Sequence, residues 1–194
     1  MPETLVRAFP SDLRASLSTV LSALPQPTHA PMGSITSTNS RTWPDIKVGG
    51  ESVDIPYRIY NPVPPTDLVQ RGSQAGAAIA CLYTRHHDGF VRQRALQHVM
   101  ACDETWIIPF VVQLLGEYVI EICEDIRRYA ETDLPRRPEM IRVLNSFASD
   151  NPDFIVLTQQ RATSYWDAYY RRPHLCRDTY PGLLALKMLL DRSA

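Results

Sequence analysis

The residue types best suited to chemistry meet at residues 85–88, where the chain reads Arg85-His86-His87-Asp88. Histidine titrates near neutral pH, so two imidazoles beside a carboxylate could transfer protons or bind a metal. Adjacent histidines usually point in different directions, however, and no second histidine follows at helical spacing. The alternative is a polar turn in which Asp88 caps the next helix. His86 and His87 are therefore catalytic candidates, and we expect no metal.

A second candidate site lies within the apolar stretch of residues 105–126. Gln113, Glu117 and Glu121 recur at steps of four and would form a polar stripe along a helix. Two carboxylates one helical turn apart repel each other by about 0.2 to 0.5 kcal/mol when exposed, and far more when buried. Glu117 and Glu121 should therefore be neutralised by cations, either in a structural network or in an acid-base or ligand-binding site.

Arginine is the cation that this chain supplies, because only two of its 20 basic residues are lysine. Such a composition is typical of a GC-rich genome, and it also suits bidentate recognition of carboxylates. Arg58, Arg85, Arg92 and Arg161 occur in segments that we expect to pack near the acidic stripe. We interpret Arg58, Arg85 and Arg161 as ligand-binding candidates.

A third group of candidates is aromatic, because residues 164–170 read SYWDAYY. At helical spacing, Tyr165, Trp166 and Tyr169 are predicted to pack in the core, and the alternative is a platform on which bases stack. Arginine pairs between residues 127 and 172 could contact phosphate, but acidic residues accompany them and the net charge is −1. Nucleic-acid binding is thus only a third hypothesis.

The elements that must position these residues are mainly helical. Apolar periodicity and capping signals predict helices over residues 11–24, 66–84, 89–101, 105–126, 138–147, 152–171 and 181–190. The segment 105–126 is apolar almost all round and should be one long central helix. Asp88 should cap the helix over 89–101, in which Val91 faces inward and Arg92 does not.

The first 65 residues differ from the rest. Ser11 is expected to cap the first helix, and residues 26–41 read as a long loop. Residues 45–48 and 52–60 alternate as strands about a Gly49-Gly50-Glu51 turn, and Pro56 marks the second as an edge strand. The length of 194 residues suits a single domain, in which residues 1–65 lie against a helical core of residues 66–194.

One stretch resembles a known family. Residues 88–96, DGFVRQRAL, are similar to the start of the second helix of a HEAT repeat, where an Asp cap precedes Val-Arg and apolar residues. The predicted helices form three hairpins that begin near residues 66, 106 and 152, a spacing in the range of HEAT or armadillo repeats. The fold expected is mainly α, with stacked antiparallel helix hairpins, either HEAT-like or an irregular bundle, and a small N-terminal β-hairpin.

The cysteines and the N-terminus indicate a cellular location. Cys81, Cys102, Cys123 and Cys176 form no C-x-x-C pair, and we expect buried, reduced thiols. Residues 1–24 do not resemble a secretory leader, and Gln113, Glu117 and Glu121 make the longest apolar run too polar to span a membrane. We therefore expect a cytoplasmic protein.

The leading functional hypothesis is a non-catalytic interaction or scaffold protein. Stacked helices commonly offer a surface to a protein partner, and the sequence contains no G-x-S-x-G, Walker or G-x-G-x-x-G motif. No cofactor or membrane is expected. The alternative is an enzyme or small-ligand binder whose pocket combines His86 or His87 with Glu117, Glu121 and an arginine.

Overall fold

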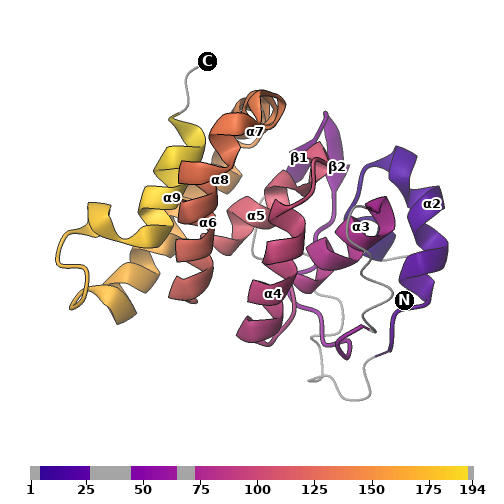
Figure 1. Ribbon diagram of the computed structural model, residues 1–194, viewed down its shortest axis with the longest axis horizontal. Coiled ribbons are helices and arrows are strands. Elements are labelled where there is room, and N and C mark those ends of the chain that lie inside the picture. Colours follow the sequence, from indigo (N-terminus) through magenta and orange to yellow (C-terminus); the bar gives the residue numbers. More distant parts are fainter. Residues whose placement is uncertain (1–4, 27–44, 65–72, 192–194) are drawn as a thin grey trace. The chain divides into compact units, whose positions relative to one another are not determined.

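A computed structural model describes residues 5–26, 45–64 and 73–191 of the chain. These residues form mainly helices, together with one small two-stranded antiparallel sheet (Figure 1). The mainly helical fold with a small N-terminal hairpin is thus confirmed. The chain divides into two compact units, Met1–Phe110 and Val111–Ala194. The expectation of a single domain stays a prediction.

Helix α2, Ser11–Ser22, opens the first unit and buries a face of leucines spaced four residues apart. Ser11 is its first residue and not, as predicted, its cap. The backbone N–H and the hydroxyl of Ser11 both donate to the carboxylate of Glu51, at 2.9 Å each. A carboxylate at the N-terminal end of a helix interacts favourably with the helix dipole. The bond from the Ser11 N–H is the main reason that the pKa of Glu51 is lowered.

The sheet pairs β1, Ile46–Val48, with β2, Glu51–Val53. Gly49 and Gly50 form the turn with φ of 58° and 84°, a left-handed conformation that glycine adopts without steric cost. The turn therefore holds two residues, and the prediction that it includes Glu51 is wrong. The second strand is also shorter than predicted and ends before Pro56, which lacks the N–H needed to continue a ladder.

Helix α3, Gln74–Tyr83, lies in the core of the first unit, with every residue from Gly76 to Tyr83 buried. It begins at Gln74 because Ser73 is extended and its hydroxyl accepts the N–H of Gly76, which caps the helix. The predicted start near residue 66 lies outside the described residues. Because Ser73 is extended, the prediction of one continuous helix over residues 66–84 is wrong.

Helix α4, Gly89–Met100, packs against α3 (Figure 1). Its cap is confirmed, because the Asp88 carboxylate accepts the N–H groups of Phe90 and Val91 at 2.8 and 3.4 Å. These bonds, chiefly the one from Phe90, lower the pKa of Asp88. The side chain of Val91 is buried as predicted.

The long helix predicted over residues 105–126 is broken. It consists of a 3₁₀ turn, Thr105–Ile107, helix α5, Ile108–Leu114, and helix α6, Ile120–Thr132. Between α5 and α6, the N–H groups of Leu115, Gly116 and Glu117 bond to carbonyls three residues earlier and close a tight turn. Glycine within a helix costs about 1 kcal/mol relative to alanine, and this cost favours a break at Gly116. Residues 106–117 are nevertheless all buried.

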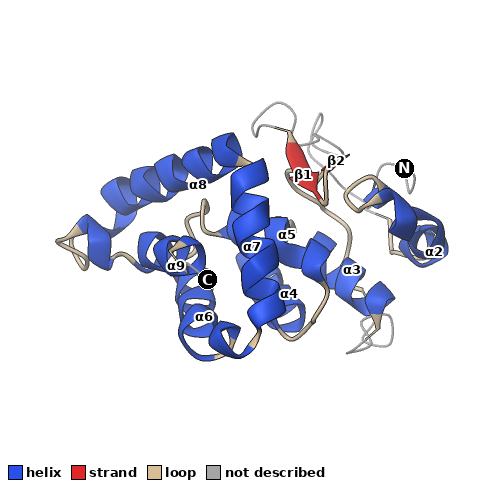
Figure 2. Cartoon of the chain, turned by 90° about the horizontal axis from the view of Figure 1, so that it is seen from above, coloured by secondary structure: helices blue, strands red, loops and turns tan. Residues whose placement is uncertain are grey.

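In the second unit, α6 packs chiefly on the last helix, α9, Pro181–Leu190 (Figures 1 and 2). Helices α7, Pro138–Asp150, and α8, Pro152–Tyr165, also contact α9. Each of these three begins with proline, whose missing N–H leaves no donor unsatisfied in a first turn. Since α9 returns to α6, packing here does not follow chain order, and the HEAT resemblance stays a prediction.

The contact between α6 and α9 depends on a small residue. A Cβ atom at Gly182 would lie 2.8 Å from a ring carbon of Tyr180 and 3.2 Å from the Sγ of Cys123. Burial raises the pKa of Cys123 to about 12. None of the four cysteines forms a disulfide, but the predicted burial holds only for Cys81 and Cys123, since Cys102 is half-buried and Cys176 is exposed. No helix in the described part of the chain has both the length and the apolar character to cross a bilayer.

Candidate functional site

The α3–α4 turn, residues 84–88, contains the histidine candidates. The ring of His86 is bonded to the backbone through both nitrogens: Nδ1 accepts the N–H of Asp88, and Nε2 lies against the carbonyl of Asn61, both at 3.0 Å. Because Nδ1 accepts, the proton is on Nε2, which donates. Burial, and then the neighbouring His87, lowers the pKa of His86. His86 is therefore a neutral ring with no nitrogen open to a substrate.

His87 faces solvent and stacks on Tyr60, with ring centroids 4.9 Å apart. The rings of His86 and His87 lie 4.2 Å apart, so the expectation that they diverge is wrong. Ile59 donates its N–H to the carbonyl of Arg85 and accepts the N–H of His87, as in a parallel bridge. The preceding segment thus holds the turn in an extended form.

Two arginines of the first unit are buried. The exposed fractions of Arg85 and Arg92 are 1% and 0%. The Nη1 of Arg92 donates to the carbonyls of His86 and His87 at 2.8 and 3.0 Å. The prediction that Arg92 points away from the core is wrong, because carbonyls of a buried turn need donors that water cannot supply. The burial of Arg85 favours a structural role over contact with a free ligand.

The remaining candidates do not form the predicted stripe. Glu117 is buried in the turn between α5 and α6, whereas Glu121 is exposed in the first turn of α6. Since the helix is broken between them, they do not share a helical face, and that prediction is wrong. In the same unit, the Nε of Arg161 donates to the carbonyl of Gly116 at 3.1 Å. Neutralisation of Glu117 by arginine stays a prediction.

Arg58 belongs to the first unit and contacts its own neighbour. Its guanidinium lies over the ring of Tyr57, 5.0 Å from the centroid, and donates to the Tyr57 carbonyl at 3.0 Å. The candidates therefore divide between the units, with both histidines, Arg58 and Arg85 in the first. Within the described ranges, no three His, Cys, Asp or Glu side chains are grouped so that they could hold a metal ion.

The aromatic segment, residues 165–180, belongs to the second unit and is largely exposed. It begins at Tyr165 and continues as one π-helical turn, Trp166–Tyr170. Tyr169 stacks on Tyr165 with centroids 6.2 Å apart, yet its side chain is 66% exposed. The core position predicted for Tyr169 is wrong, because a π turn departs from the spacing on which that prediction rests. The exposed fraction of Leu175 reaches 87%.

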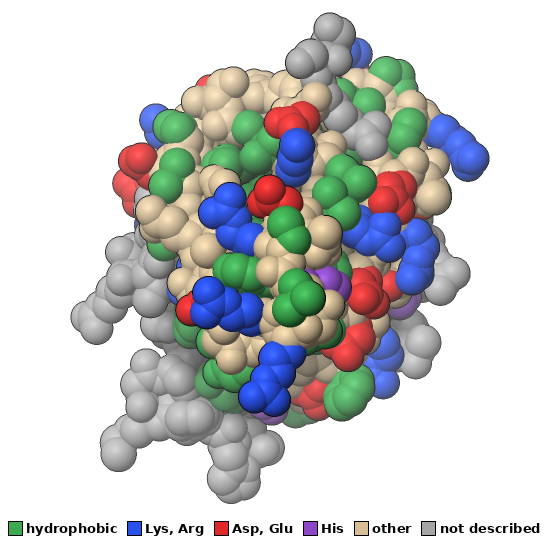
Figure 3. All heavy atoms as spheres, turned by 90° about the vertical axis from the view of Figure 1, so that its left-hand side faces the viewer, with side chains coloured by type: hydrophobic (Ala, Val, Ile, Leu, Met, Phe, Trp, Pro, Cys, Tyr) green, Lys and Arg blue, Asp and Glu red, His purple; other side chains and the backbone are tan. Residues whose placement is uncertain are grey.

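Several bonds hold this segment in one conformation. The indole N–H of Trp166 donates to the carbonyl of His174 at 2.8 Å, and the Tyr170 hydroxyl donates to the carbonyl of Tyr118. Arg171 lies over the ring of Trp166, at 5.6 Å from the centroid, and pairs with Asp167 at 3.1 Å. Figure 3 shows this face of the second unit, with Lys and Arg side chains among hydrophobic and acidic ones. The segment presents apolar and cationic groups together.

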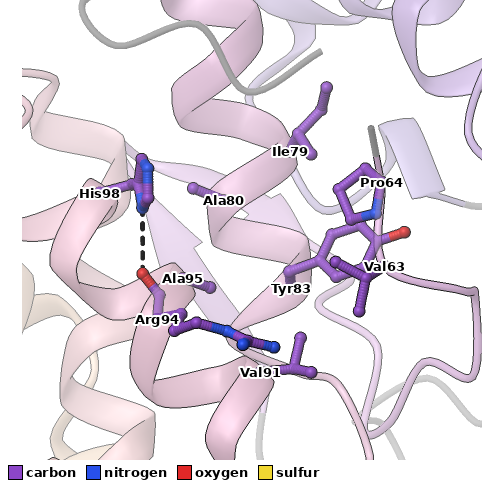
Figure 4. A pocket seen from close by; sticks show the side chains of 9 residues that line it. All are labelled: Val63, Pro64, Ile79, Ala80, Tyr83, Val91, Arg94, Ala95 and His98. Atoms are coloured by element: carbon purple, nitrogen blue, oxygen red, sulfur yellow. Dashed lines mark hydrogen bonds between the residues drawn. The ribbon is translucent and has the colours of Figure 1, made fainter. Parts of the chain in front are cut away.

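The first unit contains an apolar groove between α3 and α4, with a volume of about 220 Å³ (Figure 4). The α3 side is formed by Ile79, Ala80 and Tyr83, and the preceding segment adds Val63 and Pro64. The α4 side is formed by Val91, Arg94, Ala95 and His98. Alanines on both helices leave the space that larger side chains would fill.

A second hollow in the same unit has the opposite charge. It has a volume of about 340 Å³, and its lining includes Ser73, Cys102, Asp103 and Glu104. Glu104 already accepts the indole N–H of Trp106 at 2.8 Å. The groove between α3 and α4 therefore has basic side chains in its lining, whereas the second hollow has acidic ones.

Comparison of the chain with protein-family models, with curated proteins and with solved structures finds no match. The side chains themselves are therefore the basis for assigning a function. The sequence pointed to the α3–α4 turn and to Glu117 and Glu121 as chemical candidates, and it did not indicate the exposure of the aromatic segment. The aromatic composition of residues 164–170 is visible in the sequence. Apolar periodicity could not show that these side chains are exposed.

Proposed function

We propose that this protein is a non-catalytic interaction protein that binds a protein partner through the aromatic segment. The observation that carries the proposal is the exposure of Tyr169 and Leu175 beside Trp166 and Arg171. Tyrosine, tryptophan and arginine are enriched among residues that dominate binding energy at protein interfaces. Covering a large exposed apolar side chain with a partner lowers the free energy of the system and so favours binding.

Preorganisation supports the same proposal. Trp166 and Tyr170 are bonded to backbone carbonyls of the unit, so the segment is already ordered before a partner arrives. A surface ordered in advance loses less conformational entropy on binding. The alternative, an enzyme or ligand pocket built from histidine, Glu117, Glu121 and arginine, is supported less, because both nitrogens of His86 are bonded to backbone groups and Glu121 is exposed.

The experiment first captures the partner and then tests the surface. A photo-crosslinking amino acid at position 169 should capture a partner that the same group at position 90 does not. Phe90 is a matched control, because it is 79% exposed but belongs to α4 of the first unit. With the purified partner, Tyr169→Ser and Leu175→Ser should each weaken binding about tenfold or more in titration calorimetry. Phe90→Ser should leave affinity unchanged.

The proposal fails if positions 169 and 90 capture the same proteins in equal yield. It also fails if the purified partner binds Tyr169→Ser and Leu175→Ser as tightly as the unsubstituted chain. Both residues are exposed, so the variants should retain the fold, and circular dichroism checks this.

A further inference from the structure

We infer that the groove between α3 and α4 binds a small amphipathic carboxylic acid, with its apolar body between the helices and its carboxylate at Arg94. This site belongs to the first unit and is independent of the protein partner proposed for the aromatic segment. The size of the groove, its apolar walls and the charge at its edge together select this class of ligand.

The walls suit a hydrocarbon body. Ile79 and Ala80 are 0% and 2% exposed, and Val91 and Ala95 on the opposite helix are 6% and 8% exposed. The hydroxyl of Tyr83, which also lines the groove, already donates to the carbonyl of Pro62 at 2.6 Å. Tyr83 therefore contributes its ring without an unsatisfied polar group. An apolar body placed here would lose contact with water without breaking a hydrogen bond.

The size limits the ligand. A cavity of about 150 Å³ lined by apolar side chains holds a benzene ring. At about 220 Å³, this groove should hold roughly six to ten non-hydrogen atoms. Its size arises from Ala80 and Ala95, which lie on α3 and α4 and extend only one carbon from the backbone. Saturated or aromatic acids of this length fit, whereas long-chain fatty acids exceed the space.

The charge selects a carboxylate. Two basic side chains line the groove, Arg94 and His98, and both come from α4. Among the residues that the structure describes, no acidic side chain lines it. The described residues give the Arg94 guanidinium no ion-pair partner. In Figure 4 this side chain extends from α4 toward the part of the groove near Tyr83 and Val91. A guanidinium presents paired N–H donors that match the two oxygens of a carboxylate.

His98 adds a second polar contact at this edge. Its Nδ1 lies 3.0 Å from the carbonyl of Arg94, and the dashed line in Figure 4 marks this bond. A carbonyl only accepts, so Nδ1 carries a proton and Nε2 is the nitrogen left for a ligand. Arg94 and His98 are one helical turn apart on α4, so both belong to the basic edge of the groove.

Octanoate, octan-1-ol and octylamine share an eight-carbon chain and differ in the headgroup. They therefore separate the contribution of the apolar walls from that of the charge on Arg94. We expect the full chain to bind octanoate saturably in NMR titration, with the largest shift changes at Ala80, Tyr83 and Ala95. Octan-1-ol should bind at least about tenfold more weakly, and octylamine more weakly still, since Arg94 would repel it.

Two substitutions test the site. Arg94→Gln should lower the affinity for octanoate about tenfold and leave the affinity for octan-1-ol unchanged. The exposed Arg172→Gln, in the aromatic segment, is the matched charge control and should alter neither. Ala95→Leu should fill the groove and abolish binding of both ligands. If Ala95→Leu does not fold, Arg94→Gln still decides the matter, because Arg94 is exposed.

Three results overturn the inference. The first is the absence of saturable octanoate binding at concentrations up to about 10 mM, which is ten times a dissociation constant of about 1 mM. The second is equal affinity for octanoate and octan-1-ol that Arg94→Gln does not change, which would indicate an unselective apolar hollow. The third is binding of an acidic, apolar peptide at this groove without binding of octanoate, which would assign the groove to a protein partner.

Discussion

The α3–α4 turn and the aromatic segment each connect two helices, and each contains histidine and arginine. In the turn, backbone groups bond to both nitrogens of His86, and Arg92 is bonded to two carbonyls. In the aromatic segment, Tyr169 and Leu175 project into solvent. The same residue types therefore stabilise the fold in one place and form a surface in the other. The difference lies in whether the side chains are buried, as His86 and Arg92 are, or exposed, as Tyr169 and Arg171 are.

The largest contrast should appear in thiol chemistry. Cys176 lies exposed in the aromatic segment, whereas Cys81 is buried in α3 and burial raises its pKa. Thiolate is the reactive form, and a buried thiol reacts only when the structure opens. We expect Cys176 to react with a disulfide reagent at least about 1000-fold faster than Cys81. Mass spectrometry of labelled peptides measures both rates, and Cys176→Ser should remove the fast phase. Similar rates for the two thiols would contradict the contrast.

The next largest effect should come from the two arginines. Arg92→Met removes the donor of one buried and one part-buried carbonyl and should lower the free energy of unfolding by about 2 to 4 kcal/mol. Arg171→Met removes an exposed ion pair and should lower it by less than about 0.5 kcal/mol. Urea denaturation measures both. Equal losses would show that the turn is no more structural than the aromatic segment.

Protonation should disturb the turn by a smaller amount. The pKa of His86 is lowered in the folded state, so the unfolded chain binds the proton more readily. The contribution of His86 to stability is therefore present above its unfolded pKa of about 6.5 and declines as the pH falls below it. Glutamine can accept from Asp88 and donate to Asn61 without titrating. His86→Gln should thus flatten the loss of stability between about pH 7 and pH 5. An unchanged slope would contradict the neutral, buried imidazole.

The smallest effect concerns the helix cap. Asp88→Asn keeps an oxygen that accepts the N–H of Phe90, whereas Asp88→Ala does not. The alanine variant should lower the melting temperature by a few degrees, and the asparagine variant by less. Asp167→Ala in the aromatic segment, where only an exposed ion pair is lost, should leave it almost unchanged. Equal effects of Asp88→Ala and Asp88→Asn would argue against a cap.

The features that the sequence predicted well are local. The Asp88 cap, the start of α9 at Pro181 and the glycine turn of the hairpin each follow from chemistry within a few residues. The features that it predicted poorly depend on distant partners. The N–H of Ser11, at the start of α2, donates to the carboxylate of Glu51, 40 positions away. No local sequence pattern predicts that partner.

The candidate sites failed for a related reason. Apolar periodicity across residues 105–126 shows that the segment is buried, but not that the backbone turns at Gly116. Likewise, Arg92 and Arg171 are chemically identical, and only the surroundings make one buried and the other exposed. Titratable residue types could therefore be found from sequence, whereas their accessibility could not.

The π-helical turn at Trp166–Tyr170 has an evolutionary consequence. Its hydrogen bonds enclose one residue more than those of an α-helix, so a single insertion into an ordinary helix can create it. Each residue of a helix turns the chain by about 100°, so a deletion at Ala168 would rotate the side chains that follow by that angle. A change in length by one codon could then redirect Tyr169 and Arg171 without altering any side chain. This surface is therefore open to change by insertion and deletion as well as by substitution.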